Sequence, residues 1–267
     1  QVVYRNSLVQ KYTFLDSIYG QFLKAVQKRH EVGETNLLEK LTAAAKQKEI
    51  SILLMQAEEE VKKAHTRLQQ WVQSEEPLNV ELTVLPRLKL NSLITSDHPG
   101  LRYYDAAQKF GAYELSLERQ RLLPDLQISV FQGTNNGLNP IRYNGIQAGI
   151  AVPLWFGANK SKIEAAKTAT LILADEYENY NLQLQSNYKI LLSDLKKHEA
   201  AIDYYQTSGK TLFSELTTHA SNAFHEGEID FFEYVQLLET AENIQIKYLE
   251  NLNDYNNTVL EINYLND

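Results

Sequence analysis

The chain has 267 residues, no cysteine and a formal net charge of −8. The missing cysteine excludes disulfides, thiolate metal sites and cysteine nucleophiles. The negative charge argues against a surface that binds nucleic acid or anionic lipid, because such surfaces need clustered basic residues. The sequence holds no run of about 18 apolar residues that could cross a bilayer as a helix. It also lacks nucleophile-elbow, P-loop and zinc-protease motifs, so we expect neither an enzyme nor a cofactor.

The N-terminal flank, residues 1–73, is predicted to form a helical hairpin. All six prolines lie between residues 77 and 153, and because proline breaks helices, only the flanks can carry long ones. Gln1 already lies in a helical pattern, so we expect a piece of a longer protein. Gly33 is expected to reverse the chain. Residues spaced alternately by four and three form a heptad seam, which is typical of a coiled coil: Ile50, Leu54, Ala57, Val61, Ala64, Leu68 and Trp71.

The middle of the chain is predicted to hold a linker, a helix and a β-hairpin. The linker covers residues 74–96 and is expected to run as a strand-like segment outside the helices, and the helix covers 97–122. Over residues 125–152, apolar residues alternate with polar or small ones on both sides of the polar loop GTNNGLNPIRYN. Each strand reaches about nine residues, the length of a tilted strand that crosses a bilayer. The alternative is a soluble hairpin packed on a helix.

The C-terminal flank is predicted to form a long helix over residues 158–225 and a return helix over 229–265. Each carries a seam with the same alternating spacing. The seam of the long helix is Leu173, Tyr177, Tyr180, Leu184, Tyr188, Leu191 and Leu195. The seam of the return helix is more polar: Ile244, Tyr248, Asn251, Tyr255, Thr258, Ile262 and Leu265.

The two flanks indicate an internal repeat. A shift of 194 residues carries HEVGETNLLEKL, residues 30–41, onto FHEGEIDFFEYV, residues 224–235, and Gly33 onto Gly227. The same shift superimposes the seam after Gly33 on the seam of the return helix. We therefore predict two structural repeats of helix, glycine turn and helix. The alternative is two unrelated helix ends.

Five segments together resemble the outer membrane efflux protein family, the TolC-like channels. In order along the chain they are EVGETNLLEKLTAAAKQKE (31–49), DHPGLRYYDAAQKFGAYEL (97–115), LERQRLLPDLQISVFQG (117–133), AVPLWFGANKSKIEAAK (151–167) and the tip turn with its return helix (223–265). FGANKSKIEAAK and FQGTNNG are most similar to the heavy-metal or cation efflux branch. The family pattern holds a first hairpin and its upper helix that this sequence does not match, so its first repeat is incomplete.

The resemblance implies a mostly α fold, with long antiparallel coiled-coil helices of the α-barrel type and one membrane-type β-hairpin. It implies a homotrimer whose hairpins form one barrel in outer membrane lipid and whose helices form a periplasmic tunnel. Such a channel is a passive conduit for metal cations or small toxic compounds. Its partners are a periplasmic adaptor protein and an inner-membrane pump, and nucleic acid is not among them. The alternatives are a periplasmic adaptor, which has more strands, and a soluble coiled-coil scaffold.

The resemblance also implies roles for individual residues. The adaptor would dock on two tip turns, one formed by Val32, Gly33, Glu34 and Thr35, the other by Glu226, Gly227, Glu228 and Ile229. The pore constriction would be lined by Glu39, Asp230 and Glu233, since acidic rings concentrate cations. The membrane-interface junctions would be Pro124, Pro153, Leu154, Trp155, Phe156 and Gly157, where aromatics favour the interface and Gly157 permits a bend. His30 and His225 stand beside carboxylates and are weak candidates for a metal- or pH-sensing tip; exposed His-Glu neighbours without such a role are the alternative.

Overall fold

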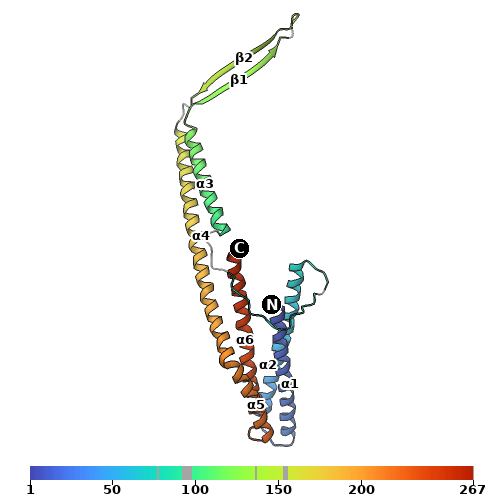
Figure 1. Ribbon diagram of the computed structural model, residues 1–267. Coiled ribbons are helices and arrows are strands. Elements are labelled where there is room, and N and C mark those ends of the chain that lie inside the picture. Colours follow the sequence, from blue (N-terminus) through green and yellow to red (C-terminus); the bar gives the residue numbers. More distant parts are fainter. Residues whose placement is uncertain (77, 92–97, 136, 153–155, 267) are drawn as a thin grey trace. The chain divides into compact units, whose positions relative to one another are not determined.

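The computed structural model describes residues 1–76, 78–91, 98–135, 137–152 and 156–266. Within these residues the chain is mostly helical and has one β-hairpin, which confirms the predicted fold class (Figure 1). The elements are α1 (Val2–Glu31), α2 (Leu37–Val72), α3 (Pro99–Gln120), β1 (Asp125–Thr134), β2 (Arg142–Ala151), α4 (Phe156–Tyr204), the π-helical turn η1 (Tyr205–Gly209), α5 (Lys210–Glu226) and α6 (Phe231–Asn266).

The chain divides into two compact units. Unit 1 comprises Gln1–Ser92 and Lys189–Tyr264, and unit 2 comprises Leu93–Tyr188 with the last three residues. Helix α4 crosses the boundary, so its first part belongs to unit 2 and its last part to unit 1. None of the helices in the described residues is both long and apolar enough to span a membrane.

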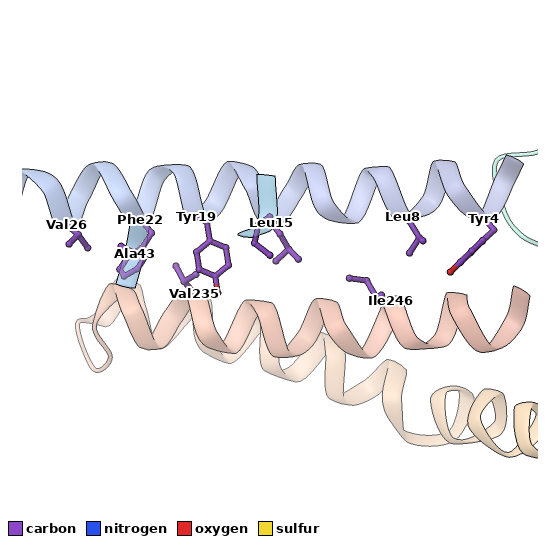
Figure 2. Close-up of a cluster of buried hydrophobic side chains, with 10 residues drawn as sticks. Tyr4, Leu8, Leu15, Tyr19, Phe22, Val26, Ala43, Val235 and Ile246 are labelled. Carbon is purple, nitrogen blue, oxygen red and sulfur yellow. The ribbon is translucent and has the colours of Figure 1, made fainter. Parts of the chain in front are cut away.

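The core of unit 1 is an apolar stripe on α1 that faces α6. Figure 2 shows these α1 side chains directed toward Val235 and Ile246 of α6. Phe22 also packs edge-on against Phe231, with ring centroids 5.4 Å apart. Burying each large apolar side chain contributes about 1.5–3 kcal/mol, so this stripe joins the first helical hairpin to the last. Its buried members recur at roughly heptad spacing: Tyr4, Leu8, Leu15, Tyr19, Phe22 and Val26.

The predicted heptad seam of α2 is buried along most of its length. Ile50, Ala57 and Ala64 are buried at intervals of seven residues, as a coiled-coil seam requires. Trp71 is different, because its side chain is 86% exposed. The helix ends one residue later at Val72, and the following Gln73 adopts a left-handed conformation with φ 55°, so the seam stops at Leu68.

Two ion pairs and a hydrogen bond also join α1 and α2 to α6. Lys11 of α1 lies 3.3 Å from the buried carboxylate of Glu242. Lys46 of α2 lies 3.6 Å from Glu239, which also accepts a hydrogen bond from the Tyr19 hydroxyl. Two carboxylates one turn apart on α6 therefore hold both helices of the first hairpin.

The long helix predicted over residues 158–225 is interrupted in the structure. The π-helical turn η1 separates α4 from α5. A β-carbon on the buried Gly209 would lie 3.2 Å from a ring carbon of Tyr205 and 3.3 Å from the Ile244 side chain. Gly209 therefore allows η1 to approach α6 closely. The π turn shifts the helical phase, and Tyr205 stacks on Tyr248 with ring centroids 3.9 Å apart.

The linker is fixed to α6 by asparagine side chains. Asn256 donates a hydrogen bond to the Pro86 carbonyl at 2.7 Å and accepts one from the Leu88 amide at 2.8 Å. Two helical turns further along α6, Asn263 accepts a hydrogen bond from the Asn91 amide at 3.0 Å. Residues 86–91 are therefore held along α6, and we call this segment the linker strap.

In unit 2, α3 packs against the first part of α4. A β-carbon on Gly111 would lie 2.9 Å from the Leu173 side chain, and one on Gly100 would collide with the ring of Tyr180. Thr170 donates a hydrogen bond to the Gly111 carbonyl at 3.3 Å. The two glycines therefore permit close contact between the helices. Helix α3 begins one residue after His98, which caps it by accepting a hydrogen bond from the Gly100 amide.

The hairpin of unit 2 is antiparallel, and its register pairs Leu126 with Ile150 and Val130 with Ile146. Because side chains alternate between the two faces of a strand, Leu126, Ile128 and Val130 share one face with Ile146 and Ile150. These five side chains are between 69% and 78% exposed. No helix of the described residues therefore covers this apolar face, in contrast to the alternative of a hairpin packed on a helix.

Candidate functional site

The first candidate tip turn ends α1. Gly33 has φ +78°, a left-handed conformation in which glycine avoids the strain of a side chain. The Glu34 amide donates to the Arg29 carbonyl at 2.8 Å, and the Gly33 amide donates to the His30 carbonyl at 3.1 Å. This pair of bonds is a Schellman motif, which satisfies the free carbonyls at a helix end.

The second candidate tip turn repeats this geometry 194 residues later. Gly227 has φ +75°. The Glu228 amide donates to the Ala223 carbonyl at 2.8 Å, and the Gly227 amide donates to the Phe224 carbonyl at 3.2 Å. All four positions match those of the first turn under the same shift of 194 residues. Because many helices end in this motif, the internal repeat remains a prediction.

The helices that leave the two turns are capped at equivalent positions. Asn36 accepts a hydrogen bond from the Glu39 amide at 2.9 Å. Asp230 accepts one from the Glu233 amide at 2.8 Å, and the Glu233 carboxylate reaches back to the Asp230 amide at 3.4 Å. The second arrangement is a capping box. The caps therefore fix the positions of the three carboxylates predicted to line a constriction.

The carboxylate of Glu39 has further partners at the first turn. It accepts a hydrogen bond from the Thr35 hydroxyl and lies 3.7 Å from the Arg29 guanidinium. Its side chain is about one third exposed. A role in a constriction remains a prediction for Glu39, Asp230 and Glu233. The side chains of Asp230 and Glu233 cap α6, whereas that of Glu39 contacts Thr35 and Arg29.

Both turns belong to unit 1, and aromatic side chains connect their helices. Phe224, which precedes the second turn, lies 5.3 Å from Phe231 and 4.8 Å from Tyr234, measured between ring centroids. Phe22 of α1 contacts Phe231 and Phe232. The residues of the turns themselves are exposed except Thr35 and Ile229, which are half-buried. The turns therefore present backbone to solvent on a packed aromatic base.

The first turn also carries an apolar patch, which sequence reasoning missed. Val32, Leu37, Leu38 and Leu41 are each more than half exposed. The signal was available, because Leu37, Leu38 and Leu41 do not continue the spacing of the buried Ala43 and Ile50. We call these four residues the first-turn patch.

The two histidines at the turns are engaged by backbone carbonyls of their own segments. The Nδ1 atom of His30 lies 3.2 Å from the Thr35 carbonyl oxygen, and that of His225 lies 2.6 Å from the Ser221 carbonyl oxygen. Across the described part of the chain, no group of three or more histidines and carboxylates is arranged to hold a metal ion.

The membrane-interface junctions are described in part. Pro124 directly precedes β1, where its missing amide hydrogen removes no bond of the hairpin. Pro153, Leu154 and Trp155 lie outside the described residues. Phe156 begins α4, and Gly157 lies in its first turn without a left-handed φ. The bend expected at Gly157 remains a prediction, because the residues directly before Phe156 lie outside the described ones.

Comparison with known proteins identifies the fold. No protein-family model and no curated protein matches the sequence. Among solved structures, the CmeC outer membrane channel of Campylobacter jejuni matches with a TM-score of 0.80 at 14% identity, covering 99% of this chain and 59% of that one. CusC, whose structures concern transmembrane channel formation, matches with a TM-score of 0.76 at 15% identity, covering 99% of this chain and 65% of CusC.

A third match agrees with these two. The outer membrane protein VceC of Vibrio cholerae gives a TM-score of 0.72 at 14% identity, covering 99% of this chain and 64% of VceC. The chain thus spans about three fifths of the length of the structures that it matches. Identities this low speak for the fold alone, and the chain has the TolC-like fold of these outer membrane channels, as its sequence motifs predicted.

Proposed function

We propose that this chain forms part of the outer membrane channel-tunnel of a tripartite efflux pump. It acts there as a passive conduit and not as an enzyme. The observation that carries the proposal is the agreement in fold with CmeC over 99% of the chain. An exposed hairpin with one apolar face accompanies that agreement.

The hairpin enters outer membrane lipid in this proposal. Each strand has 10 residues, which is the length that a tilted strand needs to cross a bilayer. The apolar face formed by Leu126, Ile128 and Val130 with Ile146 and Ile150 is directed toward lipid. The opposite face, which carries Gln127, Ser129 and Gln147, is directed toward water in the barrel. The helices form the wall of a periplasmic tunnel.

A homotrimer explains an exposed stripe on α3. Tyr103, Phe110, Tyr113 and Leu117 recur at heptad positions and are between 51% and 75% exposed. Their spacing is that of a coiled-coil face, whereas α3 packs on α4 through Gly111 on another face. A helix of a neighbouring copy covers this stripe in the trimer.

The adaptor docks at the tip turns in this proposal, and the inner-membrane pump drives transport through it. The exposed backbone of Gly33 and Gly227 and the first-turn patch supply the contact surface. Beside the second turn, a groove of about 330 Å³ lies between α5 and α6 and is lined largely by apolar side chains, among them Leu212, Leu216, Ile229 and Leu237. A helical hairpin of the adaptor, with an apolar edge, fits such a surface.

Metal cations or small toxic compounds are the proposed cargo. Glu39, Asp230 and Glu233 repeat around the threefold axis and form an acidic constriction that concentrates cations. The net charge of −8 also favours positively charged cargo.

Two measurements test the proposal. The natural full-length protein, reconstituted in planar bilayers, is expected to form open pores, and Glu233→Gln together with Asp230→Asn is expected to lower the preference of these pores for cations. A photo-crosslinker at Glu34 or Glu228 is expected to capture a periplasmic adaptor in cells, whereas one at the exposed Glu58 of α2 is not. Absence of pores under conditions where the protein is folded contradicts the proposed function.

A further inference from the structure

Two aromatic residues of the hairpin lie opposite glycines. The register pairs Phe131 with Gly145 and Tyr143 with Gly133. A β-carbon on Gly145 would lie 2.3 Å from the Phe131 ring, and one on Gly133 would lie 2.5 Å from the Tyr143 ring. Each ring therefore lies over the backbone of the facing strand, in space that any other residue would fill. Both glycines are half-buried in a hairpin that is otherwise largely exposed.

The rings are on the face opposite the apolar one. Phe131 and Gly133 share a face with Gln127 and Ser129, because side chains alternate along the strand. The apolar face ends at Val130 and Ile146. Beyond that level its positions are polar: Gln132, Thr134, Arg142 and Asn144.

The two faces therefore exchange apolar and polar character between the Val130–Ile146 pair and the Phe131–Gly145 pair. Below that level, apolar side chains occupy one face and polar ones the other. At the level of Phe131 and Tyr143, the aromatics occupy the face that is polar below. Aromatics of a membrane-interface belt point toward lipid, so this pair does not fit such a belt. In the proposed barrel the pair faces the water-filled lumen near the loop end of the hairpin.

The exposed sides of the rings remain available to a ligand. Phe131 is 47% exposed and Tyr143 is 52% exposed, although one side of each ring covers a glycine. On this face of the two strands only Asp125, at the far end, is charged. A flat aromatic face attracts a cation through its quadrupole, and quaternary ammonium groups are the ligands that such faces bind well.

We infer that Phe131 and Tyr143 form a lumen-facing aromatic site for organic cations near the loop end of the barrel. The inference rests on the proposed function and names a cargo class for it. Hydrated inorganic ions pass this site, because the rings lie along the wall and carry no charge. Organic cations bind at this aromatic site. The three hairpins of a trimer carry three copies of the Phe131 and Tyr143 pair.

Block by tetraethylammonium tests this site in the reconstituted full-length protein. Tetraethylammonium, added on the side of the hairpin loop, is expected to reduce the potassium current. In F131L/Y143L the half-blocking concentration is expected to rise about fivefold, since exposed cation–π contacts are weak. In F131Y/Y143F, which keeps both rings, the half-blocking concentration is expected to stay at the wild-type value. I128L/I146L, on the apolar face, is the matched control and is expected to block like wild type.

The outcomes separate the inference from the proposed function. If F131L/Y143L conducts potassium and is blocked as strongly as wild type, the aromatic site is wrong and the channel stands. A purely structural role of the rings predicts lower thermal stability without a change in block. If F131L/Y143L forms no pores, F131W/Y143W is the deciding variant. Its larger π faces are expected to strengthen the block by tetraethylammonium. An unchanged block in this variant contradicts the inference. If the wild type forms no pores, both proposals fall.

Discussion

At the scale of single residues, the glycine turns are where sequence reasoning was most informative. Gly33 and Gly227 are the only glycines in the described residues with a left-handed φ, and the repeat had placed a turn at both. The caps were missed, although Asp230 and Glu233 have the spacing of a capping box in the sequence.

Replacing Gly33 tests the cost of the left-handed conformation. No atom lies within 4 Å of a β-carbon on Gly33 or on Gly20, so neither substitution creates a clash. Gly33→Ala is expected to destabilise unit 1 by about 1 kcal/mol, because an L-residue is strained at that φ. Gly20→Ala in the interior of α1 is expected to stabilise it by about 0.5–1 kcal/mol. Urea unfolding followed by circular dichroism measures both, and a loss of equal size for the two variants contradicts the account.

Replacing Asp230 tests the cap of α6. Asp230→Ala removes the acceptor of the Glu233 amide and is expected to cost about 1 kcal/mol. Asp230→Asn keeps an acceptor oxygen and is expected to restore most of that loss. The same unfolding measurement decides the matter, and an alanine variant as stable as the asparagine variant means that the cap does not contribute.

At the scale of elements, α6 holds unit 1 together. It contacts α1 through the apolar stripe, both helices of the first hairpin through Glu239 and Glu242, and the linker strap through its asparagines. The sequence predicted a seam on α6 but not the two asparagines beside that seam that hold the linker strap. Asparagines at 256 and 263 are separated by seven residues, about 10 Å of helix. Leu88 and Asn91 are separated by about the same length of extended chain.

Removing the Asn256 amide tests the linker strap. Asn256→Leu is expected to release the Leu88 amide, so that its hydrogen exchange accelerates by at least tenfold, since a hydrogen bond that links two elements is lost. Asn263→Ala is the internal control and is expected to accelerate exchange at Asn91 but not at Leu88. Unchanged exchange at Leu88 in Asn256→Leu means that the strap is held by other contacts.

Buried tyrosines on α1 make unit 1 sensitive to alkaline pH. Burial, with a smaller effect from Glu250, raises the pKa of Tyr4 to about 12. Burial and the hydrogen bond to Glu239 raise the pKa of Tyr19 as well. Because the unfolded chain ionises near pH 10, the stabilisation by each neutral tyrosine is complete below pH 10. For Tyr4 it is lost between about pH 10 and 12.

Between the pKa of the unfolded chain and that of the folded protein, each buried tyrosine is expected to lower the free energy of unfolding by up to about 1.4 kcal/mol per pH unit. As the pH rises from 10 to 12, the urea concentration at the unfolding midpoint should decrease in the wild type. It should decrease less steeply in Tyr4→Phe. A wild-type curve that is flat in this interval, or a Tyr4→Phe curve identical to it, contradicts the assignment.

At the scale of the whole molecule, the order and type of the elements followed from the sequence. The distribution of prolines separated the helical flanks from the hairpin, and period-two alternation located both strands. The π turn at Tyr205–Gly209 was not predictable from periodicity, since it depends on how closely Gly209 approaches Ile244 of α6. Trp71 was wrongly placed in a seam, because heptad spacing does not reveal where the helix that carries it stops packing.

The central claim is that the hairpin is a membrane element with one face in lipid and the other in water. This chain has no cysteine, so single cysteines at 126, 127, 128, 129 and 130 each add one thiol to it, and any cysteine in the rest of the full-length protein is replaced by serine. Labelling with a membrane-impermeant maleimide in outer membranes of intact cells is the most direct measurement. The account predicts labelling at 127 and 129 and protection at 126, 128 and 130. Equal labelling at all five positions contradicts it and favours a soluble coiled-coil scaffold or a periplasmic adaptor.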